Sequence, residues 1–183
     1  VFGTGTSYGA EFVLQRRRGG WTGWRGYTWS RTDRLFADLN EGLPFPSRYD
    51  RRHDLSLVLE WRIDDRWKLG GTFIYGTGNA ITVPSQRYFV DGNLLDVYGP
   101  RNGFRMPAYH RADFGATLDP RVKPGKKRRG QWVFSVYNLY NRQNPFFIYF
   151  NNEGDLAEGT LDIQAYQVSL FPILPSVTWN FKF

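Results

Sequence analysis

The stretch that decides the fold is the last nineteen residues, Ala165 to Phe183, with the sequence AYQVSLFPILPSVTWNFKF. From the carboxyl end backwards, apolar and polar residues alternate: Phe183, Phe181, Trp179 and Val177 are apolar, and Lys182, Asn180, Thr178 and Ser176 are polar. A period of two gives a β-strand one apolar and one polar face. A final strand that ends on an aromatic ring suits a transmembrane barrel, whose last strand pairs on both edges and whose interfaces are rich in aromatic residues. An edge strand of a soluble sandwich fits the same alternation.

The composition is rich in aromatic residues and modest in hydropathy. Aromatic residues make up 18% of the chain, yet the mean hydropathy is −0.51. No apolar run approaches the roughly 18 residues that a membrane helix needs. These features favour a β-barrel wall, in which only alternate residues meet lipid, or an aromatic-rich secreted β-protein.

Metal and cofactor sites are not indicated. Cysteine is absent, which excludes disulfides and thiolate ligands, and the two histidines, His53 and His110, are too few for a histidine-rich metal centre. The first residues open directly into a strand-like pattern without a signal peptide, so we expect a processed or truncated piece of a longer protein.

The net charge of +7 is concentrated in places. Eight of the 24 basic residues fall in two short stretches next to glycine, and in one case proline. The stretches comprise Arg16, Arg17 and Arg18, then Lys123, Lys126, Lys127, Arg128 and Arg129. We interpret them as solvated turns in preference to a nucleic-acid-binding patch.

Seven strands are predicted from the period-2 pattern. They are Tyr8–Gln15, Trp21–Arg31, Asp54–Ile63, Trp67–Thr77, His110–Leu118, Gln131–Asn141 with a continuation through Pro145 to Asn151, and the final stretch. A smaller hairpin is predicted between Gln86 and Tyr98, around an Asp91-Gly92 turn, and a short acidic turn between Glu153 and Gly159.

The connections fall into two length classes. The turns near Arg18, Asp65 and Pro124 are short or compact, whereas Thr32 to Asp50 and Gly78 to Tyr109 are long and the sixth connection is intermediate. In an up-and-down meander the two classes lie at opposite ends of the strands. Short turns at one end and long loops at the other are typical of outer-membrane barrels.

The strand faces support the same interpretation. If Leu55–Ile63 and Phe114–Leu118 turn their apolar sides to lipid, the charged residues of these strands point into the lumen, where they avoid a cost of about 2–4 kcal/mol each. These residues are Asp54, Glu60, Arg62, Arg111 and Asp113. Arg16 and Arg25 break the pattern, although Arg16 lies at a rim. Arg25 shares its side with Trp21, Tyr27 and Trp29, which leaves the facing of that strand ambiguous.

Five motifs together resemble the C-terminal third of TonB-dependent outer-membrane receptors of the Bacteroidetes type. They are GLPFPSRYDRRHD (Gly42–Asp54), TGNAITVP (Thr77–Pro84), RMPAYHRAD (Arg105–Asp113), VYNLYNRQNP (Val136–Pro145) and LFPILPSVTWNFKF (Leu170–Phe183).

The resemblance implies an all-β chain that supplies about seven antiparallel strands to a 22-strand, plugged, up-and-down barrel in the bacterial outer membrane. Such a receptor imports a siderophore, glycan or peptide and is powered by a TonB-type energy-coupling protein. The plug domain and about two-thirds of the wall lie outside this sequence. The resemblance also allows a surface lipoprotein lid, and it identifies Phe183, Phe181 and Trp179 as the signal for the barrel-assembly machinery.

No catalytic site is predicted. His53 with Asp50 and Asp54, and His110 with Asp113, suggest acid–base or metal chemistry, but hydrogen bonds and charge pairs at the barrel rim explain them better. No Ser-His-Asp order, glycine-rich phosphate loop or catalytic carboxylate pair is present, so we expect no enzyme.

Ligand contacts are expected from the long loops. The candidates are residues whose rings stack on sugars or whose guanidinium groups bind anions: Tyr88, Tyr98, Arg101, Arg105 and Tyr109. The alternative is that these residues hold the loops against one another.

Two other functions compete with transport. A secreted, aromatic-rich β-sandwich would use the long loops to bind carbohydrate. A basic nucleic-acid-binding module ranks third, because it requires the clusters near Arg17 and Lys127 to lie on one face.

Overall fold

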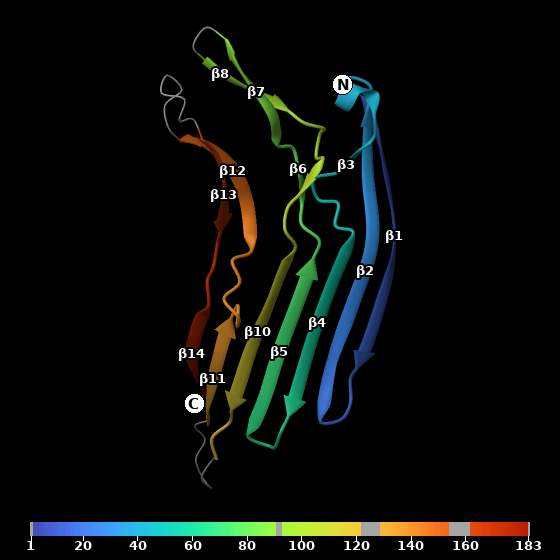
Figure 1. Cartoon of the computed structure of the whole chain (residues 1–183). Helices are drawn as coiled ribbons and strands as arrows, with labels where there is room; N and C mark the ends of the chain where they lie inside the picture. The colour runs from blue at the N-terminus through green and yellow to red at the C-terminus, as the bar shows by residue number, and fades with distance from the viewer. Residues whose placement is uncertain (1, 91–92, 122–128, 154–161, 183) are drawn as a thin grey trace.

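The computed structural model describes residues 2–90, 93–121, 129–153 and 162–182, and it is all-β with antiparallel pairings. Its main sheet follows the order β1-β2-β4-β5-β10-β11-β14 (Figure 1). These strands are β1 (Gly3–Arg16), β2 (Trp21–Phe36), β4 (His53–Arg62), β5 (Trp67–Gly76), β10 (Tyr109–Leu118), β11 (Arg129–Tyr137) and β14 (Leu174–Lys182). The short β3 (Phe45–Pro46) pairs with the far end of β2. The seven predicted strands are therefore confirmed as the up-and-down meander of one sheet.

The predicted sixth and seventh strands are each interrupted. β11 ends at Tyr137 instead of Asn141, and the final stretch divides into β13 (Asp162–Ser169) and β14. β12 (Pro145–Glu153) pairs with β13 in a separate hairpin. The breaks have local causes: Asn138 and Asn141 adopt positive φ angles of 54° and 52°, and Pro172 has no N–H to donate to a ladder.

The two ends of the sheet carry different connections. At the turn end, residues 17–20 and 63–66 make short turns (Figure 1). At the loop end lie η1 (Asn40–Gly42), β6 (Ala80–Ile81) paired with β9 (Phe104–Arg105), and the hairpins β7 (Pro84–Val90)–β8 (Asn93–Tyr98) and β12–β13. The predicted small hairpin is confirmed as β7–β8. The turns predicted at Asp91-Gly92 and Pro124, the acidic turn after Glu153 and most of the second basic stretch lie outside the described residues.

The strand register separates an apolar face from a polar face. Paired residues in an antiparallel sheet share a face, so one register row runs through Trp21, Trp61, Leu69, Ala116, Phe134 and Val177. The neighbouring rows place Asp54, Glu60, Arg62, Arg111 and Asp113 together on the other face. The predicted division of these strands into two faces is therefore confirmed. The facing of β2, which the sequence left ambiguous, is resolved by the register: Arg16 and Arg25 lie on the apolar face with Trp21, Tyr27 and Trp29.

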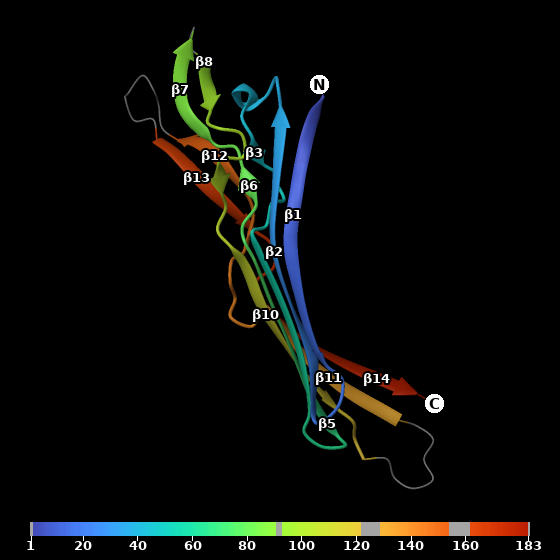
Figure 2. The same ribbon diagram turned by 90° about the vertical axis from the view of Figure 1, so that its right-hand side faces the viewer.

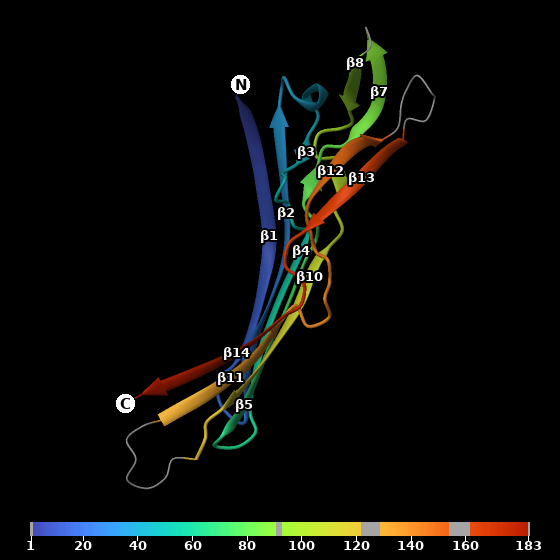
Figure 3. The same ribbon diagram turned by 90° about the vertical axis from the view of Figure 1, so that its left-hand side faces the viewer.

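The described strands form one layer without a conventional core. Side views show a single curved sheet (Figure 2, Figure 3). Among the described residues, only Phe45, Ala80 and Met106 are buried apolar side chains, and all three lie near the loop end. Large apolar residues of the two edge strands stay exposed, such as Phe12 (64%) on β1 and Val177 (63%) on β14. The described residues show an open sheet, with β1 and β14 at its two edges, and no closed barrel.

Aromatic side chains gather at both ends of the apolar face. The turn-end row consists of Trp21, Trp61, Trp67, Trp132 and Trp179, with ring centroids 4.7 Å apart for Trp21–Trp61 and 4.5 Å for Trp132–Trp179. The loop-end row consists of Tyr8, Trp29, Tyr27, His53, Tyr75, His110 and Tyr140. Between the rows lie mainly aliphatic and Phe side chains, such as Leu57, Phe73 and Phe114. Along β4, eight residue steps from His53 to Trp61 separate the rows by about 27 Å.

The part of the chain that the structure describes contains no helix with the length and apolar character needed to cross a membrane.

Candidate functional site

Two adjoining cavities open at the loop end of the polar face. Their volumes are about 560 Å³ and 630 Å³, and both are lined by Arg48, Tyr49, Asn79, Phe146 and Phe147. The first also reaches Arg34 and Phe36 at the end of β2, and the second reaches Arg111 on β10 and Tyr137 on β11. Because they share lining residues, we treat the two cavities as one site and call it the loop-end groove.

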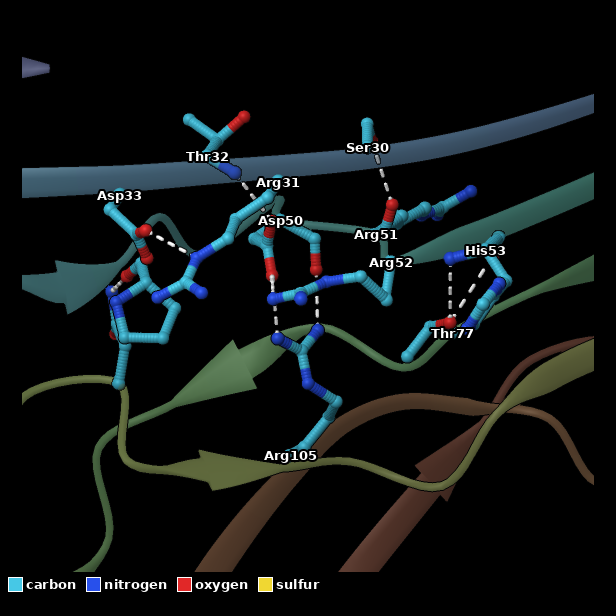
Figure 4. A network of polar contacts seen from close by, with 12 residues as sticks. Ser30, Arg31, Thr32, Asp33, Asp50, Arg51, Arg52, His53, Thr77 and Arg105 are labelled. Atoms are coloured by element: carbon cyan, nitrogen blue, oxygen red, sulfur yellow. Dashed lines mark hydrogen bonds and ion pairs between the residues drawn. The ribbon is translucent and has the colours of Figure 1, made fainter. Parts of the chain in front are cut away.

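The buried carboxylate of Asp50 fixes one wall of the groove (Figure 4). Asp50 is only 1% exposed, and its side chain accepts hydrogen bonds from the Thr32 N–H at 2.7 Å and from Arg105 Nη2 at 2.7 Å. Arg105 Nη1 also donates to the backbone carbonyl oxygens of Asp50 and Gly78. These bonds join β2, the β2–β4 connection and the β5–β10 connection. A buried charge of this kind is tolerated because it is paired and hydrogen-bonded.

Asparagine side chains tie the same two connections together further out. Asn102 donates its backbone N–H to Thr82 Oγ1 at 2.9 Å and its side-chain Nδ2 to the Pro46 carbonyl at 2.8 Å. The Arg101 N–H donates to Asn40 Oδ1 at 2.9 Å. Side chains thus complete backbone hydrogen bonds that no strand partner supplies, and the long connections form a defined surface.

A second buried hub closes the groove near β11. Asn138 is 1% exposed, and its backbone N–H donates to Asp113 Oδ1 at 2.8 Å. Its Nδ2 donates to the carbonyl oxygens of Arg142 and Phe171, at 3.0 Å and 3.1 Å, while its Oδ1 accepts the Arg142 N–H. Asn144 continues the network by bonding both the N–H and the carbonyl of His110. The segment between β11 and β12 is therefore anchored to β10 and to the chain before β14.

The groove is cationic. Five arginines line it, namely Arg34, Arg48, Arg51, Arg101 and Arg111, and no lining residue of either cavity is acidic. Arg51 pairs with Asp54 at 3.4 Å, and Arg111 pairs with Asp113 at 2.9 Å. Within the described part of the chain, Arg34, Arg48 and Arg101 have no carboxylate partner. Three guanidinium groups thus remain available for an external anion.

Exposed aromatic rings lie beside these arginines. Tyr49 is 71% exposed, and Phe146 and Phe147 are 57% and 41% exposed. The Arg101 guanidinium carbon lies 5.8 Å from the ring centroid of Phe45, which is itself buried. Rings and guanidinium groups side by side suit a ligand that carries carboxylate, phosphate or sulfate groups on a planar or apolar body.

The predicted ligand residues divide into three groups. Arg101 and Tyr109 line the groove. Arg105 is part of the Asp50 hub, which corresponds to the alternative role of holding the loops together. Tyr88 and Tyr98 lie on the β7–β8 hairpin and line neither cavity. The sequence interpretation missed Arg34, Arg48, Tyr49, Phe146 and Phe147, although Arg48 and Tyr49 stand inside one of the motifs quoted for the resemblance.

The histidines do not meet the carboxylates with which they were grouped. His53 Nδ1 lies 2.7 Å from the Tyr27 hydroxyl, and His110 Nδ1 lies 2.8 Å from the Tyr140 hydroxyl, both in the loop-end aromatic row. Asp54 and Asp113 belong to the opposite face by register. Burial raises the pKa of Tyr140 above its usual value, so this hydroxyl stays protonated as a hydrogen-bond partner. Among the described residues, no group of His, Asp and Glu is arranged to hold a metal ion.

Comparisons with protein-family models, with curated proteins and with solved structures returned no match for this chain. The resemblance to TonB-dependent receptors therefore rests on the sequence motifs alone, and the family stays a prediction.

Proposed function

We propose that this chain forms part of the wall of a transmembrane β-barrel in the bacterial outer membrane, as a segment of a TonB-dependent receptor that imports a nutrient. The observation that carries the proposal is the apolar face, an aliphatic band bounded at both ends by aromatic rows. Outer-membrane barrels have an outward-facing apolar band about 25 Å tall between two aromatic girdles. Along β4 the rows are about 27 Å apart, and a strand tilt of about 40° would reduce this to about 20 Å along the membrane normal.

The energetics of exposure point the same way. Soluble monomers rarely expose a contiguous apolar patch larger than a few hundred Å². Here mainly apolar side chains, with Arg16 and Arg25 as exceptions, cover one face of a sheet whose described strands form a single layer. Lipid is the environment in which such a face is stable, because each backbone polar group of the central strands is already paired within the sheet.

The orientation follows from the connections. Outer-membrane barrels have long external loops and short periplasmic turns, which supports an external position for the loop-end groove. The groove would then be part of the external vestibule, and its three unpaired arginines favour an anionic nutrient, such as an acidic siderophore, a charged glycan or an acidic peptide. A neutral sugar could accept hydrogen bonds from these guanidinium groups but would not balance their charge.

The partners follow from the same proposal. Further strands would pair with the free edges of β1 and β14, and a plug domain would cover the polar face. A TonB-type protein would energise transport, the barrel-assembly machinery would recognise the final strand, and a surface lipoprotein lid would cover the loop end. We assign no enzymatic activity, cofactor or nucleic-acid ligand to this segment.

Cysteine accessibility in the full-length protein tests the proposal, since this chain contains no cysteine of its own. Single cysteines at Leu57 and Leu59 should react slowly with a water-soluble maleimide in membranes and rapidly after denaturation, whereas Val58 and Glu60 face the lumen and should react in membranes. Outer-membrane fractionation and surface protease cleavage between residues 78 and 109 are expected as well. Recovery of the protein as a soluble monomer, with equal labelling of both faces, would overturn the proposal.

The exposed rings of Tyr49, Phe146 and Phe147 keep carbohydrate binding as a second candidate function, although the described strands form one layer and not the two layers of a sandwich. That function predicts a soluble monomer retained on a polysaccharide column. If the protein is retained on no polysaccharide column, carbohydrate binding is excluded.

A further inference from the structure

A hollow on the apolar face near the turn end has no role in the proposed import. Its volume is about 300 Å³, and its walls are the apolar side chains of Leu14, Trp21, Leu57 and Leu59. Arg16 and Arg25 also line it. It therefore combines an apolar floor with two cations on a face that is otherwise almost free of charge.

Gly23 creates the hollow. Its φ angle is +150°, and a Cβ at this position would lie 2.1 Å from the Val58 carbonyl oxygen, so no side chain fits. The residues of β2 on either side of Gly23 on this face, Trp21 and Arg25, both carry large side chains. The missing side chain leaves an open depression between Trp21 and Arg25 along β2.

Both arginines line this depression. In the β1–β2 register, Arg16 pairs with Gly23 and Leu14 pairs with Arg25, so the arginines are diagonal neighbours with Cα atoms about 7–8 Å apart. Arg16 Nε donates to the Arg18 carbonyl at the turn, whereas Arg25 makes no ion pair with a described residue. The carboxylates nearest along these strands, Glu11 and Glu60, belong to the polar face.

We infer that the hollow binds an anionic phospholipid of the leaflet at the turn end; this inference rests on the proposed membrane location. Arg16 and Arg25 would share the phosphate, and one acyl chain would lie against Leu14, Leu57 and Leu59. Arg25 pairs with Leu57, so it would extend toward the rim to reach the phosphate, as long cationic side chains do when their stem lies in lipid. Charge complementarity selects the headgroup: Arg17 and Arg18 in the adjoining turn add positive charge, which disfavours a lipid that carries its own ammonium group.

Native mass spectrometry of the full-length protein in a mild detergent tests the inference, with phosphatidylglycerol and phosphatidylcholine as probes. The wild type should retain phosphatidylglycerol in preference. The double variant Arg16→Gln/Arg25→Gln should bind it at least about tenfold more weakly, the loss expected for one charge-assisted interaction. The matched control Arg62→Gln/Lys68→Gln removes two cations from the polar face near the same end and should bind as the wild type does.

A variant that fills the hollow tests the acyl-chain contact separately from the phosphate contact. Leu59→Trp keeps both arginines and should weaken retention of both lipids while the preference for phosphatidylglycerol remains. Wild-type retention by Arg16→Gln/Arg25→Gln, or an equal loss in the control, would overturn the lipid site. If the protein is then still found in the outer membrane, the lipid site alone has failed; if the protein is soluble, the proposed function has failed with it.

Discussion

The turn end and the loop end of the sheet are stabilised in different ways. At the turn end, short turns and stacked tryptophans such as Trp21 and Trp61 complete the strands, and each feature is local in sequence or lies between adjacent strands. At the loop end, two buried polar residues, Asp50 and Asn138, hold connections that are distant in sequence. The comparison shows that the sheet itself follows from the residue pattern, whereas the groove depends on a few polar contacts.

The largest expected effect comes from removing the hub of the loop end. Asp50→Ala removes the carboxylate that accepts from the Thr32 N–H and balances the charge of Arg105, which should lower the free energy of unfolding by about 3–5 kcal/mol. Urea unfolding of the full-length protein in lipid vesicles measures this, and limited proteolysis should detect opening of residues 37–52. Asp54→Ala is the control, because its pair with Arg51 is about half exposed and should contribute at most about 1 kcal/mol. Equal losses of unfolding free energy in Asp50→Ala and Asp54→Ala would contradict the role of Asp50 as the hub of the loop end.

A charge placed midway between the two ends tests the apolar band. Leu57→Arg adds a second cation beside Arg25 on the apolar face at mid-depth, with an expected cost of about 2–4 kcal/mol in lipid. Val58→Arg, one position along β4, places the same cation on the polar face and should change stability little. The measurement is the free energy of unfolding of both variants in vesicles, and a larger loss for Val58→Arg would reverse the assignment of the faces.

The groove gives a smaller, functional effect at the loop end. Arg48→Ala/Arg101→Ala removes two unpaired guanidinium groups and should weaken binding of salicylate, a ring with one carboxylate, by about tenfold. Saturation-transfer NMR with the full-length protein measures this affinity. Arg62→Ala at the turn end is the control, and neutral benzyl alcohol should bind all variants alike. Unchanged salicylate binding would exclude the groove as an anion site.

The smallest effect is expected in the β4–β5 turn. The N–H groups of Trp67 and Arg66 both donate to Asp64 Oδ1 at 2.7 Å, and these bonds lower the pKa of Asp64 below its ordinary value of 3.8. The charged carboxylate therefore stabilises the folded state above that pH, and the contribution is lost as the pH falls through the lowered pKa. Asp64→Asn should thus unfold at lower urea than the wild type at pH 7 but not at about pH 2. Asp65→Asn, whose carboxylate accepts neither bond, should behave as the wild type does at both.

The sheet was predictable because its signal is periodic. The alternation in Leu55–Ile63 and in the final stretch is enough to define strands, and adjacent strands then share faces. The division into apolar and polar faces followed without knowledge of the register, since a one-residue slip would have placed charges such as Asp113 among leucines.

The groove was not predictable in the same way. Asp50 meets Arg105 across 55 positions, and Phe146 lines the same cavities as Tyr49 only because β11 ends at Tyr137. The positive φ angle of Asn138 does not change the alternation of apolar and polar residues, so the sequence pattern predicted β11 and β12 as one strand. Arg105 was assigned to ligand binding because its chemistry suits an anion, but the anion that it binds is the chain's own Asp50.

The strand count of the main sheet has a consequence for assembly. Seven strands cross from one end to the other, so the sheet begins at the loop end with β1 and finishes at the turn end with β14 (Figure 1). Bacterial single-chain barrels close with an even number of strands. In the proposed membrane setting, parity requires an odd number of further strands, and the strand next to β1 in an antiparallel barrel must ascend from the periplasmic side. A tag at Phe2 would then be accessible to antibodies on intact cells, whereas a tag beyond Lys182 would be reached only from the periplasm.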